Sequence, residues 1–354
     1  MILLLLLYGL CASFTINGIF HDKWIVVTTV QYPTEAMRKL AQLNDWQLLV
    51  IGDKKTPSDW YLDEKCIYLS IKDQEQLPYS LCKLLPYNHY SRKNIGYLYA
   101  IAHGAKIIYE TDDDNYIVNE IKIFREKPTV TLESDYPVIN IFNYFGQNTI
   151  WPRGYPLSFV TKSHEFSIKN LTSQKKIIIE QGLVDKEPDL DALFRLTRYD
   201  NTEIYFDKTK APCILQDKKF CPFNTQNTLF HQEGFWGLYI PTHVPFRVCD
   251  IWRGYITQRL LWETPYTLCF TPPEAIQERN YHDLMKDFEG EQDLYLKVTS
   301  LVNFLTNWQP KEDGLLAKSI ELYADLISQK FIGTQEQLLI QAWTDDLLAL
   351  GYFY

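Results

Sequence analysis

The sequence predicts an α/β fold built on an open, mostly parallel sheet. Apolar, β-branched runs at 24–30, 46–53 and 66–70 read as buried parallel strands. A helix-compatible segment at 36–43 separates the first two runs, and a second helical segment at 91–105 leads into the strand of 106–109. This strand–helix alternation is typical of sheets whose ligands bind beyond the carboxyl ends of the strands.

The helix expected at 91–105 has the clearest periodicity in the first half of the chain. Ile95, Leu98, Ile101 and Ala105 fall on one face, and Gly104 lies near the end of the segment. The helix therefore packs one apolar face on the sheet and delivers the chain into the next strand.

Three regions are expected along the chain. Residues 1–22 form a signal peptide or a membrane anchor, 23–273 form the α/β domain, and 274–354 form a helical extension. Within the domain, 137–145 and 175–183 are predicted as short strands. After Pro272 and Pro273 the apolar residues recur at spacings of three and four, which predicts helices.

Composition limits the partners. The chain has 354 residues and a formal charge of −9, which excludes a general nucleic-acid binder because such proteins need concentrated Lys and Arg. Residues 2–20 carry no charged side chain, a length between a signal peptide and the roughly 20 residues of a membrane helix. The expected location is the secretory pathway, as a membrane-anchored protein with a lumenal domain or as a secreted one.

The cysteines show neither a CxxC pair nor a zinc spacing. Cys213 and Cys221 are close enough in sequence for a local disulfide in an oxidising compartment, and buried free thiols are the alternative.

An acidic cluster follows the strand at 106–109. Asp112, Asp113 and Asp114 repel one another, and a divalent metal that holds a phosphorylated ligand would relieve that repulsion. A solvated acidic turn is the alternative. Thr28, Thr29 and Asp53 also lie at or just after strand ends, so all six side chains are expected to converge on one crevice.

These stretches also carry a resemblance to a known family. The segment 91–115 resembles the nucleotide-sugar domain of GT-A glycosyltransferases, a Rossmann-like mixed sheet with helices on both faces, in which a DxD motif binds metal. Four blocks in matching order between residues 92 and 289 resemble the STELLO family of Golgi glycosyltransferase-like proteins, distantly similar to the reversibly glycosylated polypeptides. The blocks are RKNIGYLYAIAHGAKIIYETDDDN, KEPDLDALFRLTR, HVPFRVCDIWRGYITQRLLWE and ERNYHDLMKDF.

The resemblance implies roles for the acidic cluster. Asp112 and Asp114, together with His282, would hold Mn²⁺ or Mg²⁺ against the diphosphate of a UDP-sugar. Asp113 would touch the ribose or the donor sugar. His282 has a surface or helix-start histidine as its alternative.

The donor site would include further residues. Asp53 would contact uracil or ribose; the alternative is an aspartate that caps a helix or a turn. Thr28 and Thr29 would line the base pocket; the alternative is that they are ordinary β-branched strand residues. Arg92 and Lys93 could reach the base or the diphosphate; the alternative is that both are solvent-exposed charges on the helix.

Asp250 begins an amphipathic helix in the third block. In inverting GT-A enzymes an acidic residue at this place deprotonates the acceptor hydroxyl, so the resemblance suggests Asp250 as general base, and an N-capping aspartate is the alternative. Arg253 could bind a phosphate or sugar oxygen, or pair with Asp250. Further candidates are His231, Asp189, Asp191 and Trp236.

The expected function is metal-dependent transfer of a sugar from a nucleotide-sugar donor to a carbohydrate hydroxyl. The alternatives are a UDP-sugar mutase-like enzyme and an inactive GT-A scaffold for glycan-synthesising complexes. An EF-hand calcium loop is excluded because the acidic segment lacks the glycine at its sixth position.

Overall fold

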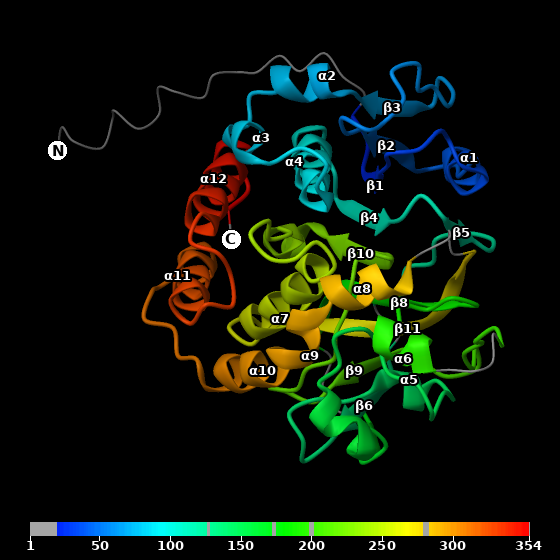
Figure 1. Cartoon of the computed structure of the whole chain (residues 1–354), viewed down its shortest axis with the longest axis vertical. Helices are drawn as coiled ribbons and strands as arrows, with labels where there is room; N and C mark the ends of the chain where they lie inside the picture. Colours follow the sequence, from blue (N-terminus) through cyan, green and yellow to red (C-terminus); the bar gives the residue numbers. More distant parts are fainter. Residues whose placement is uncertain (1–19, 126–127, 172–174, 198–201, 279–282, 354) are drawn as a thin grey trace.

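The computed structural model describes residues 20–125, 128–171, 175–197, 202–278 and 283–353. Within these residues the chain forms one mixed sheet of eleven strands covered by helices (Figure 1). The strand order is β3-β2-β1-β4-β10-β8-β11-β9-β6-β7, and β5 pairs with β11. The predicted α/β class with a mixed sheet is confirmed.

The first four strands form the parallel part of the sheet. β1 (Lys23–Thr28) lies between β2 (Gln47–Ile51) and β4 (Ile107–Thr111), and β3 (Cys66–Leu69) forms the edge beside β2. All four match predicted strands. Alternate residues of β1 and β2 enter different cores: Ile25 and Val27 face one side, and Trp24 and Val26 the other.

Beyond β4 the directions alternate. β10 (Asn227–His231) is antiparallel to both β4 and β8 (Lys176–Asp185), while β11 (Tyr266–Gln277) is parallel to β8. The carboxyl ends of β1, β2, β4, β8 and β11 and the amino end of β10 therefore meet at one edge of the sheet. The remaining strands are β5 (Asn115–Ile117), β6 (Val130–Glu133), β7 (Ser167–Asn170) and β9 (Cys213–Leu215).

Helices cover both faces of the parallel part. α1 (Glu35–Ala41) starts at Thr34, whose hydroxyl accepts a hydrogen bond from the Met37 N–H, and packs on one face. α4 (Lys93–Ala102) packs on the other, inside the predicted 91–105 range. A Cβ on Gly96 would lie 2.6 Å from Val26 Cγ1, so this glycine permits the close approach of α4 to the sheet.

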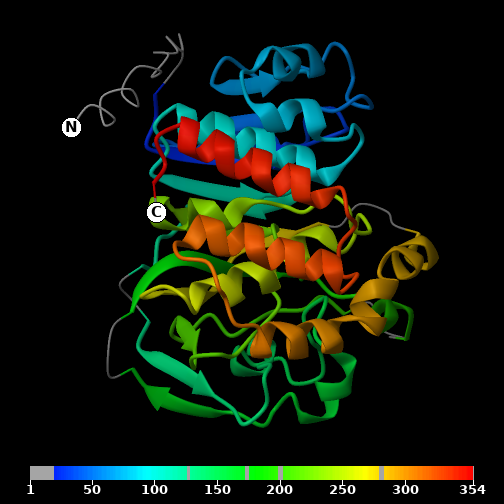
Figure 2. The ribbon, with the colours of Figure 1, turned by 90° about the vertical axis from the view of Figure 1, so that its left-hand side faces the viewer.

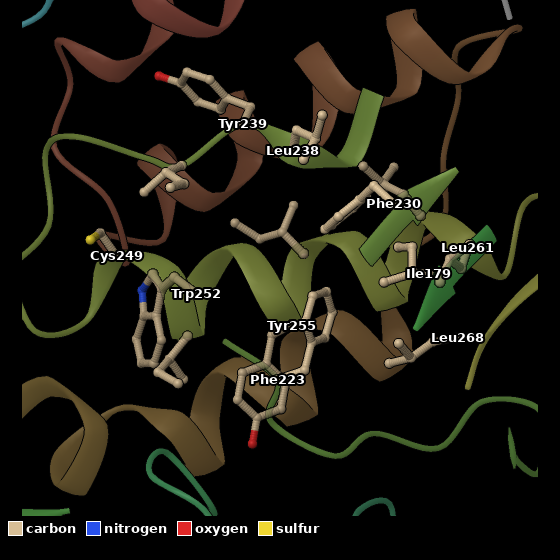
Figure 3. Close-up of a cluster of buried hydrophobic side chains, with 14 of the residues drawn as sticks. Ile179, Phe223, Phe230, Leu238, Tyr239, Cys249, Trp252, Tyr255, Leu261 and Leu268 are labelled. Atoms are coloured by element: carbon tan, nitrogen blue, oxygen red, sulfur yellow. The ribbon is translucent and has the colours of Figure 1, made fainter. Parts of the chain in front are cut away.

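Two local predictions need correction. Residues 137–145, predicted as a strand, contain the short helix α5 (Ile141–Tyr144), because a short apolar run does not distinguish strand from helix and the Asn140 side chain caps the Phe142 N–H. The helix after Asp250, expected to be amphipathic, is α7 (Cys249–Leu261), and every one of its residues is buried. Figure 3 shows α7 within a cluster of apolar side chains that includes Phe223 and Phe230.

The C-terminal helices pack against the domain. The expected boundary at residue 273 falls inside β11, which continues to Gln277 before the helices begin. α10 (Val298–Asn307) and α11 (Leu315–Ser328) contact α7, and α12 (Glu336–Ala349) contacts α3 (Ser80–Leu84). α10, α11 and α12 lie along one side of the molecule (Figure 2). The other helices are α2 (Ile71–Gln76), α6 (Ala192–Thr197), α8 (Leu284–Gly290) and α9 (Gln292–Leu296).

Two acidic side chains of α12 fasten it to the domain. The Asp346 carboxylate accepts the N–H groups of Ser80 and Leu81 at 2.8 and 2.9 Å, at the start of α3. The fully buried Glu336 carboxylate accepts the N–H groups of Thr242 and His243 and also the Tyr239 hydroxyl. The helical tail is therefore part of the domain's hydrogen-bonded core.

Glu336→Ala is expected to destabilise the fold strongly. The substitution leaves the buried donors of Tyr239 and Thr242 and the half-buried N–H of His243 without their acceptor, which should lower the free energy of unfolding by about 3 kcal/mol or more. Urea unfolding followed by circular dichroism measures this change. The exposed Glu64→Ala is the matched control, expected within about 0.5 kcal/mol of the unmodified chain. Equal stability of the two variants would contradict the role given to Glu336.

Other expectations concern the ends and the thiols. Across the part of the chain that the structure describes, no helix is long and apolar enough to cross a membrane. The apolar run of 2–20 lies outside the described residues except for Phe20, so its role stays a prediction. Cys213 and Cys221 are both free, buried thiols, which favours the alternative of buried free thiols over a local disulfide.

Candidate active site

A pocket of about 530 Å³ opens where the strand ends meet. Its volume lies within the roughly 300–1,000 Å³ typical of small-molecule sites. Thr28, Thr29, Asp53 and the aspartates of 112–114 all line it, so the predicted convergence of strand ends on one crevice is confirmed.

The order of strands in the sheet also orders the pocket. Residues after β2 and β1 line one end, the aspartates after β4 lie in the middle, and residues from the β8, β10 and β11 side line the other end. We call the first part the β2 end and the last part the β8 end. The lining of the β8 end comprises Arg153, Asp189, Thr225, Gln226, Phe246, Arg247, Asp250 and Gln277.

Hydrogen bonds fix the loops of the β2 end. The Asp53 carboxylate accepts the N–H groups of Lys54 at 2.7 Å and His89 at 3.1 Å, and Asp53 is largely buried. The Thr56 hydroxyl donates to the Thr29 carbonyl at 2.7 Å, which ties the loop after β2 to the loop after β1. This end therefore offers a preformed surface of backbone groups and one carboxylate.

The three aspartates point to different partners. Asp112 Oδ1 accepts the Tyr90 hydroxyl at 2.6 Å, and Asp113 Oδ2 accepts the Thr29 hydroxyl at 2.6 Å. Asp114 Oδ1 accepts the Gln277 amide at 3.0 Å. Asp113 is thus bonded to the loop after β1, while Asp112 and Asp114 turn toward the middle and the β8 end of the pocket.

Lys93 supplies a buried positive charge next to Asp112. Its ammonium lies 3.6 Å from Asp112 Oδ1 and donates to the Thr111 carbonyl at 2.7 Å and the Tyr90 hydroxyl at 2.9 Å. Although 32% of the Asp112 side chain faces the open pocket, desolvation still raises its pKa to about 6 despite the nearby Lys93. Burial likewise lowers the pKa of Lys93.

At the β8 end Asp250 belongs to an ion-paired set. Arg153 Nη2 lies 2.9 Å from Asp250 Oδ2 and 3.2 Å from Oδ1, and Arg153 Nε lies 2.7 Å from Asp189 Oδ1. Asn224 also donates to Asp189, at 2.8 Å. Burial alone would raise the pKa of Asp189, but Arg153 reverses the effect and holds that pKa below its usual value. Asp250 is therefore held in a fixed orientation at the wall of the pocket.

The structure places other predicted residues away from the pocket opening. Arg92 is among the lining residues, but it is buried and its guanidinium donates to Gln74 Oε1, at 2.9 Å from Nε. Arg253 is not in the pocket lining of the described residues; it forms a buried pair with Glu110 at 2.5 Å. Its pairing with Asp250, considered from the sequence, is replaced by that of Arg153.

Three further candidate site residues are engaged in contacts within the protein, and a fourth lies outside the described residues. His231 pairs with Glu180 at 2.7 Å, and Asp191 accepts the Trp151 indole at 2.6 Å. Trp236 is buried in the apolar core. His282 lies outside the described residues, so its metal role stays a prediction.

Several pocket residues were not singled out from the sequence, among them Tyr90, Arg153, Phe246 and Arg247. Phe246 and Arg247 stand inside the block that carries the resemblance, four and three residues before Asp250, which is a signal that could have found them. Arg153 lies nearly a hundred residues from Asp250, and only the fold joins the two. Gly154, at φ +80°, lets the loop of Arg153 approach α7, because a Cβ there would lie 2.4 Å from Ile251 Cγ2.

The residues of the middle part suit a hard divalent cation. Asp112 and Asp114 supply carboxylate oxygens, the ligands that Mg²⁺ and Mn²⁺ prefer. Among the described residues no group of three His, Cys, Asp or Glu could by itself hold a metal ion. One or two carboxylates together with substrate phosphates are a common arrangement for Mg²⁺, so this donor set fits a metal that arrives with a phosphorylated ligand.

The fold and the pocket define a GT-A-like α/β protein with an acidic, nucleotide-sized site at the strand-end edge of its sheet. The family model of the STELLO glycosyltransferases matches residues 247–354. Two curated proteins of Arabidopsis thaliana match most of the chain. "Probable glycosyltransferase STELLO1" is 34% identical over 349 residues, and "Probable glycosyltransferase STELLO2" is 33% identical over 351 residues.

Each match covers 94% of this chain and 45% of the relative. The chain thus spans less than half the length of these two proteins. The matches support assignment of the chain to the STELLO family, as the four sequence blocks predicted.

Proposed function

We propose that the chain is a glycosyltransferase that moves a sugar from a metal-bound nucleotide sugar, a UDP-sugar, to a carbohydrate hydroxyl. The observation that carries the proposal is that the β2 end, the acidic middle and Asp250 follow one another along the sheet edge within one pocket. The names of the two relatives support the same class of reaction.

In this proposal the β2 end binds the nucleoside. Asp53 and the backbone after β1 offer acceptors to the N–H of uracil or to the ribose hydroxyls. Asp113, anchored by Thr29, lies next to the ribose or the donor sugar. Lys93 holds Asp112 in place from within the protein.

The diphosphate lies at the middle of the pocket. Mn²⁺ or Mg²⁺ held by Asp112 and Asp114 would neutralise the charge that develops on the departing diphosphate. His282 is retained as a third proposed ligand on the basis of the family resemblance.

Asp250 acts as the general base. The acceptor oxygen forms its bond to the anomeric carbon while the bond from that carbon to the diphosphate oxygen breaks, and the hydroxyl proton passes to an Asp250 carboxylate oxygen. Arg153 holds the carboxylate toward the pocket. Attack opposite the departing diphosphate inverts the anomeric configuration.

A UDP-release assay with a panel of UDP-sugars and oligosaccharide acceptors tests this proposal. Acceptor-dependent UDP release, with an inverted product anomer by NMR, is the expected result. UDP binding without turnover of any donor would contradict a transferase and would favour the scaffold alternative. Isomerised donor without transfer would favour the mutase-like one.

The uncharged run at 2–20 supports a further proposal, that the chain works in the secretory pathway, anchored in a membrane or secreted. The family resemblance adds the Golgi membrane, with a lumenal catalytic domain, as the proposed location of an anchored chain.

A further inference from the structure

The cations at the β8 end are all matched by carboxylates in the described residues. Arg153 lies between Asp189, 2.7 Å away, and Asp250, 2.9 Å away. Arg247 lies 2.7 Å from Glu291 and 3.4 Å from Asp287. Each guanidinium of this end therefore faces two negative charges.

The other two basic residues that line the pocket belong to the β2 side. Lys55 follows Asp53 by two residues, and the Arg92 guanidinium is turned to Gln74. Asp112 and Asp114 of the middle are assigned to the proposed metal, so the charge of the β8 end is set by its own ion pairs. There four carboxylates face two guanidinium groups, and the part of the pocket beyond the diphosphate is consequently negative.

Negative charge at short range selects against an anionic sugar. Two unit charges about 4 Å apart repel by several kcal/mol at the effective dielectric of a protein surface, and an additional carboxylate would have to displace Asp189 or Asp250 from Arg153. Sugar hydroxyls, in contrast, donate hydrogen bonds to carboxylate oxygens without adding charge.

An exposed aromatic ring lies where this end meets the loop of residues 89 and 90. Phe246 has 53% of its surface exposed, and its ring packs edge-on against His89 and Tyr90, with centroids 5.8 and 6.1 Å away. An apolar ring at the pocket wall suits the C–H face of a pyranose, so Phe246 favours a sugar here, and the charges of the β8 end decide between a neutral sugar and a uronate.

From these observations we infer that the β8 end selects an uncharged donor sugar and excludes uronic acids. The inference rests on the proposed function, because it assumes that the nucleotide occupies the β2 end. Asp189 and Asp250 are the specificity-determining carboxylates, and Arg153 is the positioning residue between them.

Calorimetric binding of matched donor pairs tests the inference. UDP-glucose is compared with UDP-glucuronate, and UDP-galactose with UDP-galacturonate, so that within each pair a CH₂OH group is replaced by a carboxylate. UDP alone is titrated in parallel with Mn²⁺ present. The neutral donor is expected to bind at least about tenfold more tightly than its uronate in both pairs, given the roughly 1.4 kcal/mol that a tenfold difference requires.

A uronate that binds as tightly as its neutral partner, while UDP also binds, would overturn this inference and leave the proposed function standing. Failure of UDP itself to bind would overturn both. The two failures are therefore distinguishable within one set of titrations.

A single substitution tests whether Asp189 sets the preference for the neutral donor. Asp189→Asn removes one negative charge beside Arg153 and is expected to reduce the preference for the neutral donor severalfold, with UDP affinity unchanged. Asp135→Asn, at an exposed position away from the pocket, is the control for loss of one aspartate charge and is expected to leave the preference intact. An equal preference in both variants would show that Asp189 does not set it. The donor pairs measured with the unmodified chain test the inference even if Asp189→Asn does not fold.

Discussion

Replacement of Asp112 and Asp114 together by asparagine is expected to weaken binding of UDP in the presence of Mn²⁺ by about 100-fold, which corresponds to roughly 2.7 kcal/mol. The reason is that neutral amide oxygens replace both proposed carboxylate ligands, so the charge attraction that couples metal and diphosphate is lost. Asparagine keeps the shape of the side chain and can still accept from Tyr90 and Gln277.

The same double variant should remain folded. Because burial raises the pKa of Asp112 to about 6, the native state holds this proton more tightly than the unfolded chain. The ionised carboxylate therefore reduces stability once the pH rises through that value, and its removal relieves this cost at neutral pH. Isothermal titration calorimetry measures the affinity, and thermal unfolding at pH 7 measures the stability.

The control is an equal change of charge far from the pocket, Asp135→Asn with Asp217→Asn, both exposed. UDP affinity in the control should match that of the unmodified chain. Unchanged UDP affinity in the Asp112 and Asp114 double variant would instead support the alternative that the acidic cluster is a solvated turn.

Asp250→Asn is expected to lower kcat by about 10²–10⁴-fold while leaving UDP affinity within about twofold. Asparagine can still accept a hydrogen bond from Arg153, but it cannot take the proton of the acceptor hydroxyl. The expected split, with turnover lost and binding kept, separates a catalytic role from a purely structural one. It is measured by UDP release at saturating donor, with calorimetry for the affinity.

Arg153→Lys provides the comparison. Lysine keeps the positive charge but cannot bridge two carboxylates with the planar geometry of a guanidinium, so an intermediate loss of kcat is expected. A variant Asp250→Asn with full turnover would exclude Asp250 as base and remove the argument for an inverting reaction.

The β2 end and the acidic middle of the pocket could be predicted from the sequence. Their residues follow directly on strands whose apolar runs are easy to read, and parallel strands bring their carboxyl ends to one edge, so Thr28, Asp53 and Asp112 converge as expected. The resemblance extended this prediction by placing Asp250 at the start of a helix, where the structure also has it.

The rest depended on contacts between distant segments. Arg153 comes from an irregular loop, and its partners Asp189 and Asp250 lie 36 and 97 residues further along the chain. No local pattern encodes such a set. Similarly, the polar side chains of α7 suggested an exposed face, but Arg253 is buried because Glu110 in β4 neutralises it.

The most direct test of the central claim is calorimetric titration of UDP into the unmodified chain with and without Mn²⁺, with GDP as the control nucleotide. A nucleotide-sugar site predicts UDP binding that depends on Mn²⁺ and exceeds GDP binding. Absence of binding by either nucleotide, with or without Mn²⁺, would contradict the account of the pocket as a donor site.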